Sequence, residues 1–436
     1  SKTMPVCVGM LSDNSGERVS LLSKRNIIAG AFGNALEWYD FAVYGFMATI
    51  LANQFFPATE EVTSLLATFA AFGVGFAARP LGAIVIGRLA DRKGRKFALM
   101  VTIYLMAFGT VMIGLTPTYS SIGLMAPLLI VVARLIQGFS AGGEWGGSTA
   151  FMVEWATDNR RGFVGSFQQV SVAAGLLLGS GCAAALSSIL SEDAVTTWGW
   201  RIPFLLGGFI GLIGIYIRRN VSETPVFRST VKADQNTSTP KQFSLRQAAR
   251  AFGFTIHWTV SYYIFLAYMP TFAIRHLDLD RTAALWSNSV GLFVLMVLAP
   301  IIGLWSDKIG RKRLLTASCL GIGLLVYPVF NYLLVNPSVV AIVFAQALFG
   351  LLIALYSGPG PAAIAEIFET TNRVTGMSVG YGLAVAIFGG FSPFIATWLI
   401  ETTTSPISPA YYVSIAAICT IAVILRLPES AHRPLQ

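Results

Sequence analysis

The chain of 436 residues is 55% hydrophobic and only 12% charged, and its mean hydropathy is +0.67. Soluble domains usually carry about a quarter charged residues, so this composition excludes an ordinary soluble protein and indicates an all-α integral membrane protein. The formal net charge of +9 would suit a nucleic-acid binder. However, the basic residues lie in short loops rather than on a soluble face, so we expect no nucleic-acid partner.

Apolar runs of about 20 residues recur along the chain and predict twelve transmembrane helices in two six-helix bundles. After an N-terminal segment (1–25), the first bundle (26–218) has its expected helices at 26–52, 63–88, 97–116, 122–152, 163–190 and 200–218. A polar stretch (219–248) is typical of a linker. The second bundle (249–427) has its expected helices at 249–273, 284–305, 313–335, 338–366, 374–400 and 409–427, and a short tail (428–436) follows.

Lysines and arginines concentrate in alternate loops, for instance at 92–96 and 308–313. Under the positive-inside rule these loops, the linker and both termini are expected on the cytoplasmic side. The four cysteines are isolated and the three histidines are dispersed. We therefore expect no metal site, no disulfide, no cofactor and no enzymatic set of residues.

Two acids lie deep in the first expected helix, in the stretch "GNALEWYDF" (33–41). Glu37 and Asp40 share one helical arc with Asn34 and Tyr44. A carboxylate near the bilayer midplane is costly, and it must face a cavity, find a partner or take up a proton. We expect proton coupling through these acids, with Asp40 preferred because it lies deeper. The alternative is a structural pair in which one acid is held by an arginine.

Two arginines are also expected inside the membrane, Arg79 in the second helix and Arg134 in the fourth. A guanidinium there needs a carboxylate partner or an anionic ligand. Each arginine therefore either bridges to an acid, such as Glu37, Asp40 or Glu144, or clamps a substrate carboxylate. Other polar groups at mid-helix depth complete the expected substrate site, and these are Asn34, Tyr44, Gln137, Gln168, Gln169, Tyr262, Tyr263 and Tyr356.

An internal repeat relates the two halves. "GRLADRKGRK" (87–96) and "GLWSDKIGRK" (303–312) follow one pattern and lie between the second and third helices of each half. Two six-helix halves in the same orientation form a parallel repeat, which is typical of transporters whose halves move about a site at the membrane midplane. No GxxxxGK[ST] motif occurs, so an ion gradient rather than ATP is the expected energy source.

The architecture and this repeat resemble the major facilitator superfamily. The segments "GNALEWYDFAVYGF", "RPLGAIVIGRLADRKGRK", "RLIQGFSAGGEWGG", "WGWRIPF" and "GPGPAAIAEIF" resemble its metabolite:proton symporter branch, which includes proline/betaine, α-ketoglutarate, citrate and shikimate permeases. The resemblance covers nearly the whole chain and implies a secondary transporter of a bacterial inner membrane. It also implies conformational latches at the cytoplasmic face, formed by Asp91 with Arg95 and by Asp307 with Arg311. The alternative is a basic loop with incidental acids.

The expected function is a proton-coupled symporter that imports a small organic carboxylate, such as a di- or tricarboxylate, by alternating access, because two buried arginines favour carboxylates. The alternative is proton-coupled uptake of a zwitterionic compatible solute of the proline/betaine type, whose transporters the C-terminal "PAYYVSIAAICTIAVILRLPESAHRPLQ" resembles. The expected partners are a small-molecule substrate, protons and the lipid bilayer, and the chain is expected to act as a monomer. An enzyme and a channel are both disfavoured.

Overall fold

The computed structural model describes residue 31 and residues 33–83, 85–86, 95–156, 159–220, 244–368 and 373–433. These residues form helices joined by short loops, and no strand occurs among them. The predicted N-terminal segment (1–25) and most of the predicted linker (219–248) lie outside the described residues.

The first half of the chain begins with a helical stretch at 33–46 and ends with α11. Its labelled elements are α2 (Ala48–Phe55), α3 (Glu61–Ala77), α5 (Arg95–Leu115), α6 (Tyr119–Ile122), α7 (Met125–Ala141), α8 (Trp145–Trp155), α9 (Arg161–Ile189), α10 (Glu192–Ala194), η1 (Val195–Gly199) and α11 (Arg201–Arg219). The predicted fourth helix is divided into α7 and α8 by a turn at 142–144.

The second half contains two π-helical turns, η2 and η3, within its first and fifth membrane-crossing helices. Its elements are α13 (Leu245–Tyr263), η2 (Ile264–Tyr268), α14 (Met269–His276), α15 (Arg281–Ile309), α16 (Arg311–Val335), α17 (Val339–Ser357), α18 (Gly360–Ala365), α19 (Arg373–Ala384), η3 (Val385–Gly389), α20 (Ser392–Thr403) and α21 (Ser408–Ile424). Such turns widen a helix locally and are frequent at functional sites.

Side-chain caps explain where several helices begin. The Asp280 carboxylate accepts hydrogen bonds from the backbone N–H groups of Thr282 (3.0 Å) and Ala283 (3.3 Å) at the start of α15. The Ser338 hydroxyl accepts one from Ala341 (3.1 Å) at the start of α17. Each cap satisfies a backbone donor that has no partner within the helix.

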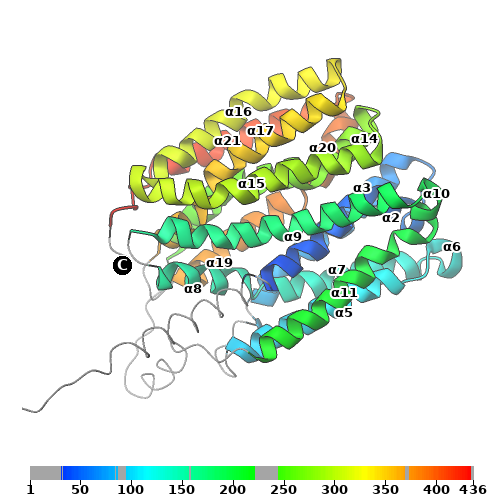
Figure 1. Cartoon of the computed structure of the whole chain (residues 1–436), viewed down its shortest axis with the longest axis horizontal. Helices are drawn as coiled ribbons and strands as arrows, with labels where there is room; N and C mark the ends of the chain where they lie inside the picture. Colours follow the sequence, from blue (N-terminus) through cyan, green and yellow to red (C-terminus); the bar gives the residue numbers. More distant parts are fainter. Residues whose placement is uncertain are drawn as a thin grey trace, which may run out of the picture.

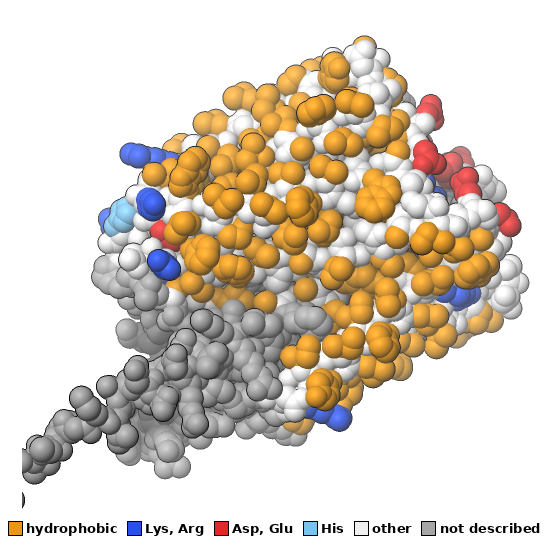
Figure 2. All heavy atoms as spheres, viewed as in Figure 1, with side chains coloured by type: hydrophobic (Ala, Val, Ile, Leu, Met, Phe, Trp, Pro, Cys, Tyr) orange, Lys and Arg blue, Asp and Glu red, His pale blue; other side chains and the backbone are white. Residues whose placement is uncertain are grey.

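Helix length and composition match a membrane protein. In the described part of the chain, six helices are long and apolar enough to cross a bilayer, and the bent pair Glu192–Gly199 with Arg201–Ile217 makes a seventh. Shorter apolar helices (Met100–Leu115, Met125–Ala141 and Ser408–Ile424) and the helical runs 33–55 and 245–276 supply the other crossings. Hydrophobic side chains cover the middle of the surface in Figure 2. The fold is a bundle of twelve transmembrane helices.

The two halves lie side by side, with α9 of the first half along α15 of the second (Figure 1). Ser180 joins these helices, since its hydroxyl donates to the carbonyl oxygen of Leu285 (3.2 Å) and lies 2.9 Å from the hydroxyl of Ser289. Small residues permit this close approach. A Cβ atom on Gly303 of α15 would lie 2.6 Å from the Gly162 carbonyl oxygen of α9.

The halves are also in contact at both ends of the bundle. At the end where α9 and α16 begin, here called the basic end, the Asp307 carboxylate accepts hydrogen bonds from the backbone N–H groups of Gly162 (2.8 Å) and Phe163 (3.0 Å). At the opposite end, where exposed acids gather (Figure 2), Arg275 pairs with Glu61 at 2.6 Å. This conformation, with contacts between the halves at both ends of the bundle, is here called closed.

Candidate functional site

The first helix carries two acids in different surroundings. The Glu37 carboxylate forms an ion pair with Arg79 at 2.7 Å, and both side chains are almost fully buried. The Arg79 guanidinium also lies over the ring of Phe76, at 4.5 Å from its centroid, and over that of Trp38 at 5.3 Å. A buried charge pair needs such additional contacts to offset its desolvation. This pair is the structural alternative that the sequence left open.

Asp40 has no such partner. Its side chain is 3% exposed, no ion pair to it is found within the described residues, and its Oδ1 atom has no hydrogen-bond donor there. It packs against Gly207 of α11, where a Cβ atom would lie 2.7 Å from Oδ1. A buried carboxyl without a counter-ion is far easier to keep in its protonated form than as an anion.

Arg134 of α7 is held inside the first half. Its guanidinium donates to Gln137 Oε1 (2.8 Å), and Gln137 in turn donates to the Thr110 hydroxyl (2.8 Å). The rings of Phe41 and Tyr44 lie 4.4 and 4.7 Å from the guanidinium carbon. This arginine is therefore enclosed by aromatic rings of the first half.

A small chamber lies between the two halves near the middle of the bundle. Its volume is ≈ 10 Å³, about the space that one water molecule needs. The chamber is enclosed by four helices, which are the first helix (33–46), α9, α13 and α19. Its lining residues are Trp38, Gln169, Val172, Trp258, Thr259, Tyr262, Tyr263 and Tyr381. Both halves therefore contribute to the lining of the chamber.

Aromatic rings form most of the wall of this chamber. Trp38 lies 6.0 Å from Tyr263 and 6.4 Å from Tyr262 between ring centroids, and Trp258 lies 6.0 Å from Tyr381. The negative faces of such rings attract cations, and cages of this kind bind quaternary ammonium groups.

The chamber wall also contains polar atoms that lack partners. Among the lining residues, four buried side-chain atoms form no hydrogen bond within the described part of the chain: Trp38 Nε1, Thr259 Oγ1, Tyr262 OH and Tyr263 OH. An unsatisfied buried polar group costs about 1–3 kcal/mol, so these four groups are available to hydrogen-bond with water or with a polar ligand in the chamber. All four can donate a hydrogen bond to a carboxylate.

The predicted site residues fall into two groups. Gln169, Tyr262 and Tyr263 line the chamber, and Gln168 is directly behind it, accepting a hydrogen bond from Gln169 (2.6 Å). The others lie outside the lining. Asn34 donates to the Ser171 hydroxyl (2.8 Å), Tyr44 donates to the Thr68 carbonyl oxygen (3.1 Å), and Tyr356 donates to the Phe254 carbonyl oxygen (2.5 Å).

Four residues of the chamber wall were not predicted as site residues: Trp38, Trp258, Thr259 and Tyr381. A signal was present in "HWTVSYY" (257–263), where Trp258 with Tyr262 and Thr259 with Tyr263 are four residues apart. Side chains with that spacing lie on one face of a helix.

The predicted latch in the second half takes part in a larger network. Arg311 pairs with Asp307 (2.7 Å) and with Glu366 (3.1 Å). Glu366, which follows α18, also pairs with Arg161 of the first half (3.2 Å). In the other repeat, Asp91 lies outside the described residues, as does the side chain of Arg95.

Comparisons with known proteins agree with this architecture. Residues 26–251 match the family model for "Sugar (and other) transporter", and residues 259–436 match that for "Major Facilitator Superfamily". The fold is similar to that of the proton:xylose symporter XylE of Escherichia coli bound to a glucose analogue, with a TM-score of 0.77 and 16% sequence identity over 95% of this chain and 98% of that one.

Similar sequences are named as transporters of proline and betaine. The chain is 34% identical to the glycine betaine/proline/ectoine/pipecolic acid transporter OusA of Dickeya dadantii, over 95% of this chain and 85% of that protein. It is 33% identical to the proline/betaine transporter of Escherichia coli over the same shares. A putative proline/betaine transporter of Staphylococcus aureus is 36% identical, over 92% of this chain and 87% of its own length.

These matches identify a membrane transporter rather than an enzyme. The chain belongs to the major facilitator superfamily, and within it to the branch that contains the proline/betaine transporters.

Proposed function

We propose that this protein is a proton-coupled symporter that imports a small zwitterionic solute, carrying one carboxylate and a substituted ammonium group, by alternating access. The names of the similar sequences support this solute class. We further propose a bacterial inner membrane as its location, cytoplasmic termini, the bundle boundaries 26–218 and 249–427, and a monomer as the working unit.

The chamber is the observation that carries the proposal. Its aromatic rings suit a quaternary or ring ammonium group, and its four unpaired donors suit a carboxylate. Trp38 links the chamber to Arg79, because its ring lines the chamber and the ring centroid also lies 5.3 Å from the Arg79 guanidinium carbon. A single arginine therefore stands at the edge of the chamber.

The position of Arg134 argues against the organic carboxylate that the sequence analysis preferred. That expectation required two arginines facing one substrate. Arg134 is enclosed by Phe41, Tyr44 and Phe72 and bonded to Gln137. Neither arginine is among the lining residues of the chamber, but Arg79 contacts one of them, Trp38. One guanidinium with an aromatic cage fits a monocarboxylate zwitterion better than a di- or tricarboxylate.

In the proposed coupling, the solute carboxylate competes with Glu37 for Arg79 as the halves open. Asp40, which forms no ion pair among the described residues, carries the proton, and the positive charge of Arg134 interacts with Asp40 at longer range and stabilises its ionised form. The state with both solute and proton bound and the state with neither bound are then favoured over states with only one of them, and this preference couples the two fluxes.

Uptake into proteoliposomes tests the proposal. We expect labelled glycine betaine or proline to accumulate when the inside is made alkaline, and unlabelled citrate not to compete. If citrate accumulates instead, the transported substrate is an organic carboxylate and the zwitterion proposal is wrong. Uptake that depends on sodium and does not respond to the pH gradient would refute proton coupling.

A matched pair of variants, Trp258→Phe and Trp258→Ala, tests the aromatic cage. The phenylalanine variant keeps an aromatic ring at this position and should retain uptake, whereas the alanine variant removes the ring and should lose it.

A further inference from the structure

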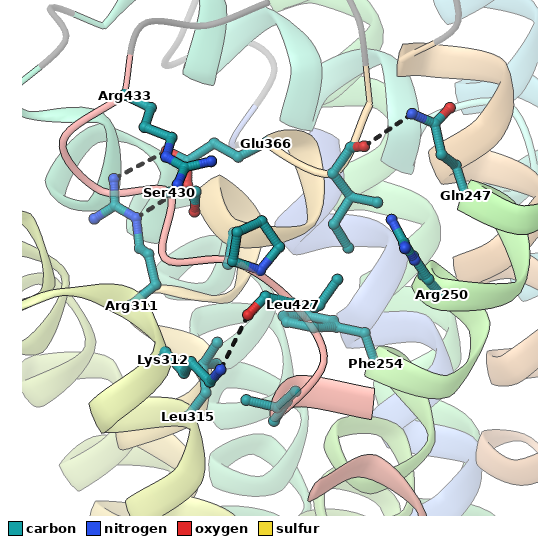
Figure 3. Close-up of a pocket in the computed structure, with 14 residues that line it drawn as sticks. Gln247, Arg250, Phe254, Arg311, Lys312, Leu315, Glu366, Leu427, Ser430 and Arg433 are labelled. Atoms are coloured by element: carbon teal, nitrogen blue, oxygen red, sulfur yellow. Dashed lines mark hydrogen bonds and ion pairs between the residues drawn. The ribbon is translucent and has the colours of Figure 1, made fainter. Parts of the chain in front are cut away.

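A second, larger cavity lies at the basic end, within the second half. Its volume is ≈ 250 Å³, and α13, α16, the end of α18 and the segment after α21 enclose it. Figure 3 shows Gln247 and Arg250 on one side, Arg311 and Lys312 on the other, and Arg433 above them. Because only the second half contributes its lining, this cavity is not part of the transport chamber.

Positive charge around this cavity exceeds the negative charge available to balance it. Arg311 is neutralised, since it pairs with both Asp307 and Glu366. Among the described residues, the Lys312 ammonium donates only to the backbone carbonyl oxygens of Leu425 (2.8 Å) and Leu427 (3.1 Å), which carry no full charge. Within the described residues, the Arg250 guanidinium forms neither a hydrogen bond nor an ion pair, although it is half-buried.

The nearest remaining acid is already engaged by backbone groups. The Glu429 carboxylate accepts hydrogen bonds from the N–H groups of Arg311 (2.9 Å), Lys312 (3.0 Å), Ser430 (3.0 Å) and Ala431 (3.1 Å). It caps the start of α16 and fastens the terminal segment there. The side chains of Arg250 and Lys312 therefore remain without a carboxylate.

We propose that this cavity is a binding site for a phosphate-bearing anion, held by Arg250 and Lys312. Guanidinium and ammonium groups are the usual ligands of phosphate oxygens. The wall between them is apolar, with Phe254, Leu315 and Ile424, so the cavity suits a phosphate that bears a small organic group. Basic pockets between helices at the level of lipid headgroups bind anionic lipids in this way.

The site has a structural consequence for the closed conformation. Ser430 donates to Glu366 (2.5 Å), and Arg161 of the first half donates to the Arg433 carbonyl oxygen (2.6 Å). The terminal segment thus bridges the halves while it forms one wall of the cavity. An anion bound there stabilises the segment and, with it, the closed basic end.

The experiment measures thermal unfolding of the full chain in phosphatidylcholine nanodiscs, with inorganic phosphate added in one arm and phosphatidylglycerol included in the other. Ligands that bind the folded state raise its Tm. We expect a rise in at least one arm, and the responding arm identifies free phosphate or a lipid headgroup as the source. In Arg250→Gln the apparent affinity should fall about tenfold or more.

Arg246→Gln is the matched control, because Arg246 lies one turn earlier on α13, is exposed and does not line the cavity. It should retain the wild-type response. Without ligand, Arg250→Gln should unfold at the wild-type temperature, because Arg250 has no partner to lose. The proposal is overturned if neither arm raises the Tm of the wild type, or if both variants lose the response equally.

Discussion

Trp145 and Tyr381 stack face to face across the boundary between the halves, with ring centroids 3.5 Å apart and planes within 2°. Trp145 begins α8 of the first half, and Tyr381 lies in α19 of the second, where it also lines the chamber. α8 ends near the basic end, and α19 begins there (Figure 1). The stack therefore separates the chamber from that end.

Trp145→Ala should open this path. An aromatic pair contributes about 0.5–1.5 kcal/mol beyond the area that it buries, so the closed population should fall severalfold. In a cysteine-free background carrying Thr259→Cys, a membrane-impermeant thiol reagent should then label the chamber faster from the basic end. Trp198→Ala, at an exposed tryptophan, is the control. Faster labelling only from the acidic end would contradict this assignment.

Breaking the pair between Glu37 and Arg79 should be costly. Arg79→Gln leaves a buried carboxylate without its partner, which typically destabilises a protein by about 3–5 kcal/mol. The double variant Glu37→Gln with Arg79→Gln removes both charges, and it should unfold at a higher temperature than Arg79→Gln alone. Thermal unfolding in detergent measures this. If the double variant is no more stable than the single one, the two side chains do not depend on each other.

The sequence predicted the helices and the depth of the charged residues, because both follow from local hydropathy. It left the partner of Arg79 open between an acid and a substrate, and packing brings Glu37 to it. The chamber could not be predicted in the same way. Trp38 and Tyr381 are distant in the chain and meet only when the halves pack together. Glu366 was missed for the same reason, since its partner Arg161 lies in the other half.

The backbones of α7 and α3 lie so close at Gly138 that a side chain there would clash. A Cβ atom there would lie 1.4 Å from the Gly75 carbonyl oxygen, where α7 crosses α3. Gly138→Ala must therefore separate these helices, and we expect a loss of at least about 1–3 kcal/mol of stability. At Gly181 of α9 a Cβ atom would meet nothing within 4 Å, so Gly181→Ala should be neutral or slightly stabilising. Equal Tm values for the two variants would contradict the packing.

The terminal segment should respond to acid through Glu429. Burial alone would raise the pKa of this carboxyl, but the four backbone donors prevail and hold its pKa below the ordinary 4.5. A depressed pKa stabilises the folded state above the unfolded pKa, and this contribution is lost as pH falls through the folded pKa. Glu429→Gln should therefore lower the Tm at pH 7, and the difference from wild type should shrink below pH 4.5. Glu401→Gln, at an exposed acid, should show no such dependence.

Asp40 should carry the coupled proton, because its buried carboxyl lacks the counter-ion that Glu37 has. Asp40→Asn mimics the protonated acid permanently. We expect it to bind solute and exchange it across the membrane, but not to concentrate it when a pH gradient is imposed. Proteoliposome exchange and accumulation assays measure the two activities separately. Asp193→Asn, at an exposed acid, should behave as wild type. If Asp40→Asn still accumulates solute while Glu37→Gln does not, the proton is carried by Glu37, and the ion pair with Arg79 must open in every cycle.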